Sequence, residues 1–462
     1  MKSPPPFDPT RRTFFRQACC AAVGATGMLS TLAQLRLIGA MAADASPTSY
    51  KALVCLFLQG GNDANNLIIP SDTSDYNAYA AARTILAVPQ SQLLPIGPLT
   101  YSDGRAWGLH PSLPEVQTLF GQRKLALLAN VGTLVQPTTL AQYNAGANLP
   151  PQLFSHIDQQ TQWQSSVPDQ PFTTGWGGRL ADLVNAMNTN NQISMSISLT
   201  GNNSFQVGNT VAQYAVSPNG AVILNGSNSG PTSQNGIRYK AQTDLLSIQE
   251  ASLFQTAFAG ITNNSINDSQ VLSSALSNAV TLKTVFPAST IGAQLNMIAS
   301  LISAGPALGL QRQIFFAQLG GWDLHANQVA DHGPLLAEIS AALNAFYSAT
   351  VELGVANQVT TFTASDFSRT LNTNGTGSDH GWGSHTMIMG GAVNGGDLYG
   401  RMPSLVIGGP DDTGRGRWVP STSVDQYSAT LASWFGVSPA SLSTVLPNIG
   451  RFAQPNLGFM GS

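Results

Sequence analysis

The sequence predicts an α/β fold in which a mostly parallel central sheet is flanked by helices. Three short apolar runs of the kind that forms buried strands carry this prediction, at 51–59, 313–319 and 359–363. An aspartate-bearing turn follows each run, and an amphipathic helix at 335–353 separates the last two. Strand, helix and strand in this order form a crossover unit with parallel strands, so their acidic turns lie at one edge of the sheet.

Length and composition limit the class of protein. The chain has 462 residues, of which 43% are hydrophobic, so it can form one large α/β domain with insertions or two domains. Charged residues make up 9%, against about 25% in a typical soluble domain. Such a composition is more typical of an exported protein than of a cytosolic one. Because the net charge is −3 and no basic patch follows the N-terminal segment, nucleic-acid binding is disfavoured.

The N-terminal segment has the pattern of a twin-arginine (Tat) export signal. The stretch TRRTFF at 10–15 precedes a moderately apolar segment at 18–42, which ends in Ala-Met-Ala, a small-x-small cleavage pattern. An amphipathic helix or a membrane anchor is the alternative, but polar residues interrupt the segment, which falls short of a spanning helix. We expect residues 1–42 to be recognised by the Tat machinery. Residues 43–462 then form the periplasmic or secreted domain, without a stable membrane span.

The first predicted strand, 51–59, ends in the turn Gly60-Gly61-Asn62-Asp63. Glycines let the backbone turn tightly, and Asp63 is left at the carboxyl end of the strand. Asparagine and aspartate after two glycines also suit an ordinary turn. Asp63 is therefore either a turn residue or a ligand at the sheet edge.

Ser155 is the notable residue in the middle of the chain. It follows a predicted buried strand at 124–131 and begins a polar helix at 157–164. Serine is a common helix cap, and a serine at a helix N-terminus is also where a nucleophile gains from the helix dipole. Both roles stay open for Ser155.

Residues 201–304 are predicted to form a cap inserted into the α/β domain. A strand with one polar face at 193–199 comes before it. The stretch 201–236 is rich in Asn, Gly and Ser with short alternating runs, which predicts a β-hairpin excursion. Helical periodicity with Asn-rich breaks follows at 239–304.

The last third of the chain carries most of the candidate site residues. The strand at 313–319 ends in a turn with Asp323 and His325, and the strand at 359–363 ends at Asp366. A loop rich in Gly, Asn, Ser and Thr follows. The remaining features of this region are Arg369, Asp379, His380 and His385, an apolar run at 387–389, a predicted strand at 405–407 and a predicted amphipathic helix at 425–435.

Carboxylates and imidazoles that meet at one sheet edge point to a metal site. A parallel sheet brings the turns after its strands together, so residues far apart in sequence can share a cleft. Aspartate and histidine are ligands of divalent ions, and we expect one or two such ions (zinc, manganese or calcium). An aspartate after a strand is often only a helix cap, so the prediction rests on the joint pattern.

The chain resembles a large family of twin-arginine-exported bacterial proteins that carry a domain of unknown function. That family is assigned to the alkaline phosphatase/sulfatase-like superfamily. The matching segments are LQGGNDANNLIIP, GLHPSL, FSHIDQQTQW, GGWDLHANQ, TASDFSRT, SDHGWGSH and VDQYSATLASWFG, which together span essentially the whole domain. The resemblance implies an alkaline phosphatase-like fold with metal ligands at the carboxyl ends of the strands.

The resemblance also implies roles for particular residues. Asp323, His325 and His380, or His385 in place of His380, are similar to the ligands of one metal site. The sequence departs from the superfamily at Phe367, which stands where a second-metal histidine is expected. The second site is therefore poorer, either empty or formed by residues from the set Asp63, Asp366, Asp379 and His385.

The function implied is a metal-dependent hydrolase of phosphate or sulfate esters, acting on a small-molecule or glycan ester. Ser155 is the candidate nucleophile, with Thr173, Thr174 or water as alternatives. Arg369 is either a contact to the substrate anion or an ion-pair partner. The competing hypothesis is a non-catalytic secreted scaffold or binding protein that keeps the fold and a structural metal.

Overall fold

The computed structural model describes residues 50–189, 193–248 and 252–461. The expected export signal at 1–42 lies outside these residues. Among the residues described, no helix combines the length and hydropathy needed to cross a membrane.

A nine-stranded sheet forms the centre of the fold, in the order β13-β5-β12-β9-β1-β8-β6-β7, with β14 also paired to β5. Within this sheet β12 is antiparallel to both neighbours, and the other pairs are parallel. The predicted α/β class with a mostly parallel sheet is confirmed. The strands are β1 (Lys51–Leu58), β5 (Leu125–Gly132), β6 (Ser196–Ser198), β7 (Tyr214–Ala215), β8 (Arg312–Leu319), β9 (Val359–Ser365), β12 (Ser384–Gly390), β13 (Leu398–Gly400) and β14 (Thr422–Ser423).

Strand β1 lies between β8 and β9, and the three strands end level with one another. Leu58 is paired with Leu319 of β8 on one side and with Ser365 of β9 on the other. Seven of the eight residues of β1 are buried, as expected for a parallel strand that is covered on both faces. The turns that follow β8, β1 and β9 therefore lie side by side, as the sequence predicts.

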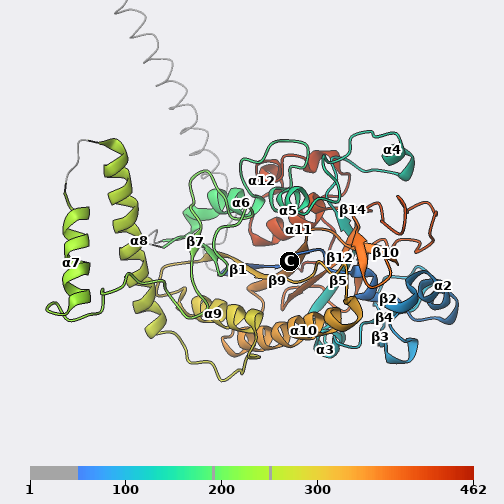
Figure 1. The fold of residues 1–462 in the computed structure, drawn as a ribbon, viewed down its shortest axis with the longest axis horizontal. Coiled ribbons are helices and arrows are strands. Elements are labelled where there is room, and N and C mark those ends of the chain that lie inside the picture. Colours follow the sequence, from blue (N-terminus) through green and yellow to red (C-terminus); the bar gives the residue numbers. More distant parts are fainter. Residues whose placement is uncertain (1–49, 190–192, 249–251, 462) are drawn as a thin grey trace, which may run out of the picture. The chain divides into compact units, whose positions relative to one another are not determined.

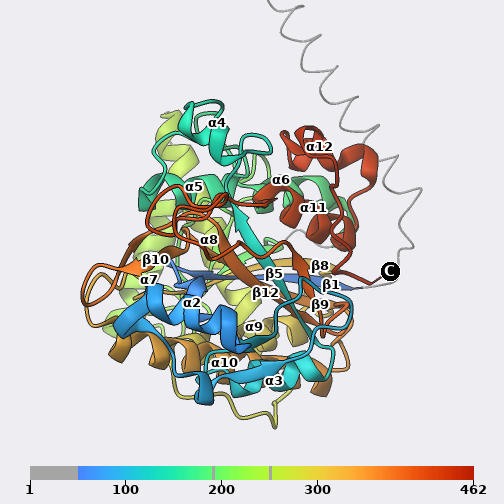
Figure 2. The same ribbon diagram turned by 90° about the vertical axis from the view of Figure 1, so that its right-hand side faces the viewer.

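Helices cover both faces of the sheet (Figures 1 and 2). One face packs against α9 and α10, and α10 also contacts α3. The predicted helix at 335–353 is the C-terminal part of α10. The opposite face carries α5, α6, α11 and α12. Their bounds are α3 (Pro114–Gly121), α5 (His156–Ser165), α6 (Trp176–Val184), α9 (Thr290–Ala304), α10 (Gln328–Glu352), α11 (Val424–Phe435) and α12 (Leu442–Val445).

Two small sheets and several short elements surround this centre. The hairpin formed by β10 (Arg369–Thr373) and β11 (Ser378–His380) pairs Arg369 with His380. A three-stranded sheet has the order β2-β4-β3. The other elements are β2 (Ile68–Pro70), β3 (Leu94–Ile96), β4 (Trp107–Leu109), α2 (Thr73–Arg83), α4 (Leu140–Asn144), and the 3-10 turns η1 (Ala64–Asn66), η2 (Thr84–Leu86), η3 (Gln90–Gln92), η4 (Asn185–Met187), η5 (Pro439–Ser441) and η6 (Ile449–Arg451).

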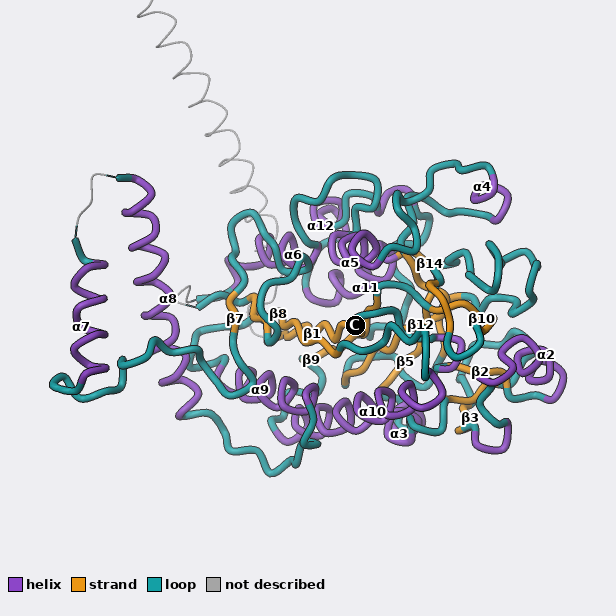
Figure 3. Tube along the Cα trace, in the orientation of Figure 1, coloured by secondary structure: helices purple, strands orange, loops and turns teal. Residues whose placement is uncertain are grey.

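The expected insertion at 201–304 has a different internal structure from the one predicted. In place of a β-hairpin, the only strand within 201–236 is the two-residue β7, which runs parallel to β6 at the edge of the central sheet. Helices α7 (Gln234–Leu246) and α8 (Leu253–Ser277) stand side by side beyond this edge (Figures 1 and 3). Helix α9 contacts β8 and α10, so it is part of the layer that covers the sheet.

The predicted strand at 405–407 is wrong. These residues lie in a loop, and Leu405 has a positive φ of 56°. Val406 and Ile407 are 55% and 43% exposed. A run of three apolar residues is too short to distinguish a buried strand from an exposed loop.

Candidate metal centre

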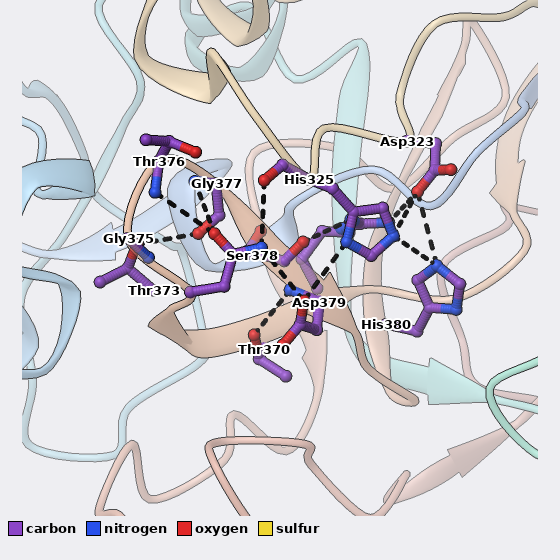
Figure 4. Close-up of polar contacts among 12 residues, drawn as sticks. Asp323, His325, Thr370, Thr373, Gly375, Thr376, Gly377, Ser378, Asp379 and His380 are labelled. Atoms are coloured by element: carbon purple, nitrogen blue, oxygen red, sulfur yellow. Dashed lines mark hydrogen bonds and ion pairs between the residues drawn. The ribbon is translucent and has the colours of Figure 1, made fainter.

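Asp323, His156 and His380 form a cluster in which one ligand atom from each lies within 4.8 Å of the others. The Nε2 atoms of His156 and His380 are 3.1 Å apart, and each is 3.5 Å from Asp323 Oδ1. His325 extends the cluster, because its Nε2 lies 2.8 Å from His380 Nε2 and 3.1 Å from Asp323 Oδ1. Figure 4 shows Asp323, His325 and His380 facing one another. We call these four residues the His₃Asp cluster.

Three parts of the chain supply the His₃Asp cluster. Asp323 and His325 lie in the turn after β8, His380 ends β11, and His156 is the first residue of α5. The turn after β1 packs directly against the turn after β8 at Gly60. A Cβ on Gly60 would lie 2.5 Å from the backbone nitrogen of Asp323, and its φ is +117°. Only glycine suits both the conformation and the space.

The other ring nitrogen of each imidazole is held by an oxygen atom. Nδ1 of His156 lies 2.6 Å from Asp366 Oδ2, and Nδ1 of His325 lies 3.3 Å from Asp379 Oδ1. Nδ1 of His380 lies 2.7 Å from the carbonyl oxygen of Phe154. Carboxylate and carbonyl oxygens only accept hydrogen bonds, so each Nδ1 carries the proton. In the neutral rings the three Nε2 atoms, which lie 3.1–3.5 Å from Asp323 Oδ1, are then free of protons and can act as ligands.

Asp366 lies behind the cluster and orients it. Its Oδ2 accepts from His156 Nδ1 and, at 2.8 Å, from the side chain of Gln160, while Oδ1 accepts from the backbone of Gly60 at 3.1 Å. The side chain of Asp366 is fully buried. The hydrogen bond to Asp366 raises the pKa of His156 above its ordinary value. Asp366 therefore has the position of a carboxylate that supports a metal-bound histidine.

Phe367 packs against two of the imidazoles. Its ring centroid lies 4.8 Å from that of His156 and 4.7 Å from that of His380, which it stacks at 30°. The side chain is fully buried. The ring that stands in place of the expected histidine thus contacts a histidine that comes from α5.

Arg369 is engaged with the cluster and the backbone. It pairs with Asp323 Oδ1 at 2.7 Å and also donates to the carbonyl oxygens of Gly60 and Ser378. Burial would raise the pKa of Asp323, but the hydrogen bond and charge of Arg369 lower it below its usual value. Burial lowers the pKa of His380, which favours the neutral ring. Arg369 therefore keeps Asp323 ionised and fixes its position.

The structure does not place Asp63 in the cluster. Its carboxylate forms an ion pair with Arg83, accepts from Gln328 and, at 3.1 Å, accepts from the backbone of Asn65. Both Asp63 and Arg83 are buried. An aspartate with these partners serves as a buried counterion and caps the turn η1. This correction removes Asp63 from the metal ligands expected from the sequence.

His385 and Asp379 also lie outside the ligand positions. Nδ1 of His385 accepts from the backbone of Asn130 at 3.0 Å, and burial lowers the pKa of this histidine to about 3. His385 is therefore a neutral residue of the core, and its assignment as a ligand is corrected. Asp379 supports His325 and pairs with Arg415.

Ser155 lies next to His156 at the N-terminal end of α5. Its hydroxyl donates to Asp158 Oδ2 at 2.6 Å, and it makes no side-chain capping bond to the helix backbone. Ser155 therefore occupies the N-cap position, but its side chain does not cap the helix.

His156 is the site residue that the sequence reasoning missed. It lies 210 positions before its partner Asp366, and the strand-end pattern gives no reason to include a helical residue. Two signals were available. The chain contains only six histidines, and the segment FSHIDQQTQW places one of them directly after the candidate nucleophile.

A family model covers most of the chain. Residues 50–442 match the model described as "Protein of unknown function (DUF1501)". The chain belongs to the DUF1501 family. No curated protein matches it.

Solved structures similar to this DUF1501 protein include two hydrolases. One is a sulfatase from Pseudoalteromonas sp., with 10% identity, a TM-score of 0.37, and coverage of 93% of this chain and 74% of that chain. Another is a phosphonate monoester hydrolase from Silicibacter pomeroyi, with 7% identity, a TM-score of 0.33, and coverage of 84% and 73%. Likeness at this level carries no argument about the activity of the DUF1501 chain.

The donor set of this DUF1501 protein fits a divalent ion. Three imidazole nitrogens and one carboxylate oxygen are a ligand set of the kind that binds zinc. Each imidazole also has the oxygen partner on Nδ1 that metal-binding histidines ordinarily have. The His₃Asp cluster could therefore hold a metal ion.

Proposed function

We propose that this protein is an exported metal-dependent hydrolase of phosphate or sulfate esters, with one divalent ion bound by the His₃Asp cluster. The observation that carries the proposal is the convergence of three Nε2 atoms and Asp323 Oδ1, with each Nδ1 held by an oxygen atom. Three imidazole nitrogens and a carboxylate oxygen that meet at these distances, each ring held from behind by an oxygen atom, match the donor set of a divalent ion.

Zinc or manganese suits this cluster better than calcium. Calcium takes about six to eight oxygen ligands, whereas three of the four donors here are nitrogen atoms. We also propose one ion rather than two. Asp63 is paired with Arg83, and Asp366 is bonded to His156, Gln160 and Gly60, so the carboxylates expected for a second ion have other partners.

A divalent ion at this position would supply Lewis-acid stabilisation of the charge that develops on the ester oxygens. The residues of the chain would then hold the reacting groups. Asp366 keeps the Nδ1 proton of His156 in place, and Arg369 keeps Asp323 ionised. Ser155 is the proposed nucleophile. Its oxygen would attack the phosphorus or sulfur atom while the bond from that atom to the ester oxygen breaks and the alcohol leaves, and Asp158, 2.6 Å from the hydroxyl, would accept the serine proton and return it to the leaving oxygen. A water molecule is the alternative.

The substrate anion needs a cation other than Arg369, whose guanidinium is already bonded to Asp323 and two carbonyl groups. We assign this role to Arg417. Its Nε donates to the carbonyl oxygen of His380 at 2.8 Å, and its guanidinium lies 4.7 Å from the Phe154 ring centroid. Its terminal nitrogens form no recorded hydrogen bond within the described chain. A guanidinium held in this way can bind a phosphate or sulfate group.

The test combines metal analysis with enzyme assays on the exported protein. Bound metal is measured by mass spectrometry, and 4-nitrophenyl phosphate, bis(4-nitrophenyl) phosphate and 4-nitrophenyl sulfate are the substrates. Asp323→Ala and His156→Ala should lose the metal and all turnover. Asp331→Ala is the matched control, because Asp331 is an exposed carboxylate on α10 outside the cluster. Ser155→Ala should keep the metal but reduce kcat by at least about a hundredfold if serine is the nucleophile.

The outcomes separate the parts of the proposal. Bound metal with no turnover on any ester class would contradict the hydrolase and leave the scaffold hypothesis. Absence of metal after reconstitution with zinc or manganese would contradict the ligand assignment. Full activity in Ser155→Ala would remove serine as the nucleophile and favour water.

A further inference from the structure

A groove with a volume of about 900 Å³ lies at the β7 end of the central sheet. One wall is α8, and the other is formed by the segments that lead into β6 and β7. Because these segments precede parallel strands, the groove faces the amino ends of the strands. The His₃Asp cluster follows the carboxyl ends of β8 and β9, so the two lie at opposite edges of the sheet.

The wall formed by α8 is polar. Asn264, Asn267, Asp268 and Val271 line the groove, and their spacing of three and four residues places them on one face of the helix. Gln270 adds another amide at this wall. A helix that covers a protein surface ordinarily turns an apolar face inward. The face of α8 that looks into the groove instead carries mostly amide and carboxylate groups.

Four of the polar side chains that line the groove are not used to hold the fold together. Asn264, Asn267 and Asp268 of α8, and Asn185 on the opposite side, have no recorded side-chain hydrogen bond to the described part of the chain. Amides elsewhere do have structural partners. Gln206, for example, donates to the carbonyl oxygens of Ile197 and Ile314 at the sheet centre. The amides of Asn185, Asn264 and Asn267 are therefore available to a ligand, whereas Gln270 donates to the hydroxyl oxygen of Tyr239 at 3.2 Å.

The charge of the groove restricts what the ligand can be. Among the described residues that line it there is no lysine, arginine or histidine, and Asp268 is the one acidic residue. Anions would meet a carboxylate and no cation, so they are disfavoured. Amide side chains donate and accept hydrogen bonds at the same time. They suit an uncharged ligand with many hydroxyl groups, which also donate and accept.

We propose that this groove binds a neutral oligosaccharide, with the amides of Asn185, Asn264 and Asn267 and the carboxylate of Asp268 as its hydrogen-bond partners. A site of this kind, at the sheet edge opposite the metal cluster, would attach the protein to a glycan independently of ester hydrolysis. Its volume of about 900 Å³ falls within the range of ligand-binding pockets.

The test screens the full exported chain on an array of neutral and anionic oligosaccharides. The best neutral glycan is then titrated by calorimetry. The double substitution Asn264→Ala and Asn267→Ala should weaken binding about tenfold or more, because at least two hydrogen bonds are lost. Both side chains are exposed and alanine favours helices, so the variant should fold. Gln255→Ala is the control, since Gln255 is an exposed amide of α8 that does not line the groove.

Three results would overturn the proposal. They are an array with no neutral glycan bound, a preference for anionic glycans, and a neutral glycan whose affinity is unchanged in the double variant. Binding should persist in His156→Ala, which removes a metal ligand. This last measurement separates the groove from the proposed hydrolase, so either proposal can fail alone.

Discussion

Phe367 and His156 show how an apolar ring and a helical histidine together shape the His₃Asp cluster. Phe367 is fully buried and stacks on His380, so its ring restricts the rotation of that imidazole. His156 packs on the same ring and brings an Nε2 atom from a different element. An apolar contact thus helps to preorganise the polar cluster, which reduces the ordering cost when an ion binds.

Asp366→Asn tests whether the carboxylate behind His156 contributes to metal binding. The amide can still accept the Nδ1 proton, but a neutral acceptor makes the imidazole a weaker ligand. We expect zinc affinity to fall about ten- to a hundredfold, measured by competition with a chelating indicator. Asp331→Asn is the control, because it changes an exposed carboxylate by the same chemistry. Equal affinity in the wild type and Asp366→Asn would show that Asp366 is only a packing residue.

Asp425→Asn tests the cost of a buried acid in the first turn of α11. Burial raises the pKa of Asp425 to about 7, and its Oδ1 has no hydrogen-bond partner. Because the folded pKa exceeds the unfolded one, the folded state binds the proton more tightly. This contribution to stability is present at acidic pH and is lost as the pH rises to about 7.

Replacement by asparagine removes that titration. The free energy of unfolding of the variant, compared with that of the wild type at the same pH, should therefore be about 1–3 kcal/mol higher at pH 8 than at pH 5. Urea unfolding of wild type and Asp425→Asn at both pH values measures this difference. A difference that is independent of pH would show that Asp425 is not protonated in the folded protein at pH 5.

At the scale of elements, the β10–β11 hairpin sets the distance between two halves of the cluster. Gly377, which directly precedes β11, lies against the turn after β8. A Cβ there would be 2.3 Å from the carbonyl oxygen of Leu324 and 2.5 Å from the carbonyl carbon of His325. Both contacts are with backbone, which cannot move aside without shifting the turn. The close approach of hairpin and turn is what places His380 beside His325.

Gly377→Ala should therefore separate the two elements and weaken metal binding. We expect at least about a tenfold loss of zinc affinity and a loss of about 1–3 kcal/mol in stability from overpacking. Zinc competition and urea unfolding measure the two effects. Gly97→Ala is the control, since a Cβ at Gly97 meets no atom within 4 Å. Unchanged zinc affinity in Gly377→Ala would mean that the hairpin does not determine the geometry of the cluster.

The elements differ in how far the sequence predicts them. Strands β1, β8 and β9 are covered on both faces, so each leaves a continuous apolar run that marks its position. Residues 405–407 have a similar composition but lie in an exposed loop, because three residues carry too little information. The prediction of a β-hairpin at 201–236 is wrong for a related reason, because short alternating runs do not specify which strand they pair with.

At the scale of the whole molecule, topology brings the site together, and only part of that is visible in the sequence. The turns after β8 and β9 are level because their strands are parallel neighbours of β1, which the pattern of strand and helix predicts. The contribution of α5 depends on a helix packing across the sheet, and no local pattern encodes it. Asp63 follows a strand end, as a metal ligand at this sheet edge would, but its carboxylate forms an ion pair with Arg83 on α2.

Three histidines with lowered pKa values, two of them buried and one half-buried, make the whole fold sensitive to acid. Burial lowers the pKa values of His332 and His385 to about 3 and that of His110 to about 4. Unfolding exposes the rings and returns each pKa to about 6.5. Between these values the unfolded state binds more protons, so stability falls as the pH decreases below about 6.5. Asp425 opposes the trend, because it is protonated only in the folded state over the same range.

Near pH 5.5 each of the three histidines gains nearly one proton on unfolding, and Asp425 loses about one. Unfolding should therefore take up about two protons in total. The metal-free protein should then lose about 3 kcal/mol of stability per pH unit between pH 6 and pH 5. Urea unfolding in a metal chelator measures this slope without a contribution from metal release. His385→Gln lowers stability at every pH, but the slope should fall to about half because one proton site is lost. An unchanged slope in this variant would show that His385 is not the neutral buried group that its contact with Asn130 indicates.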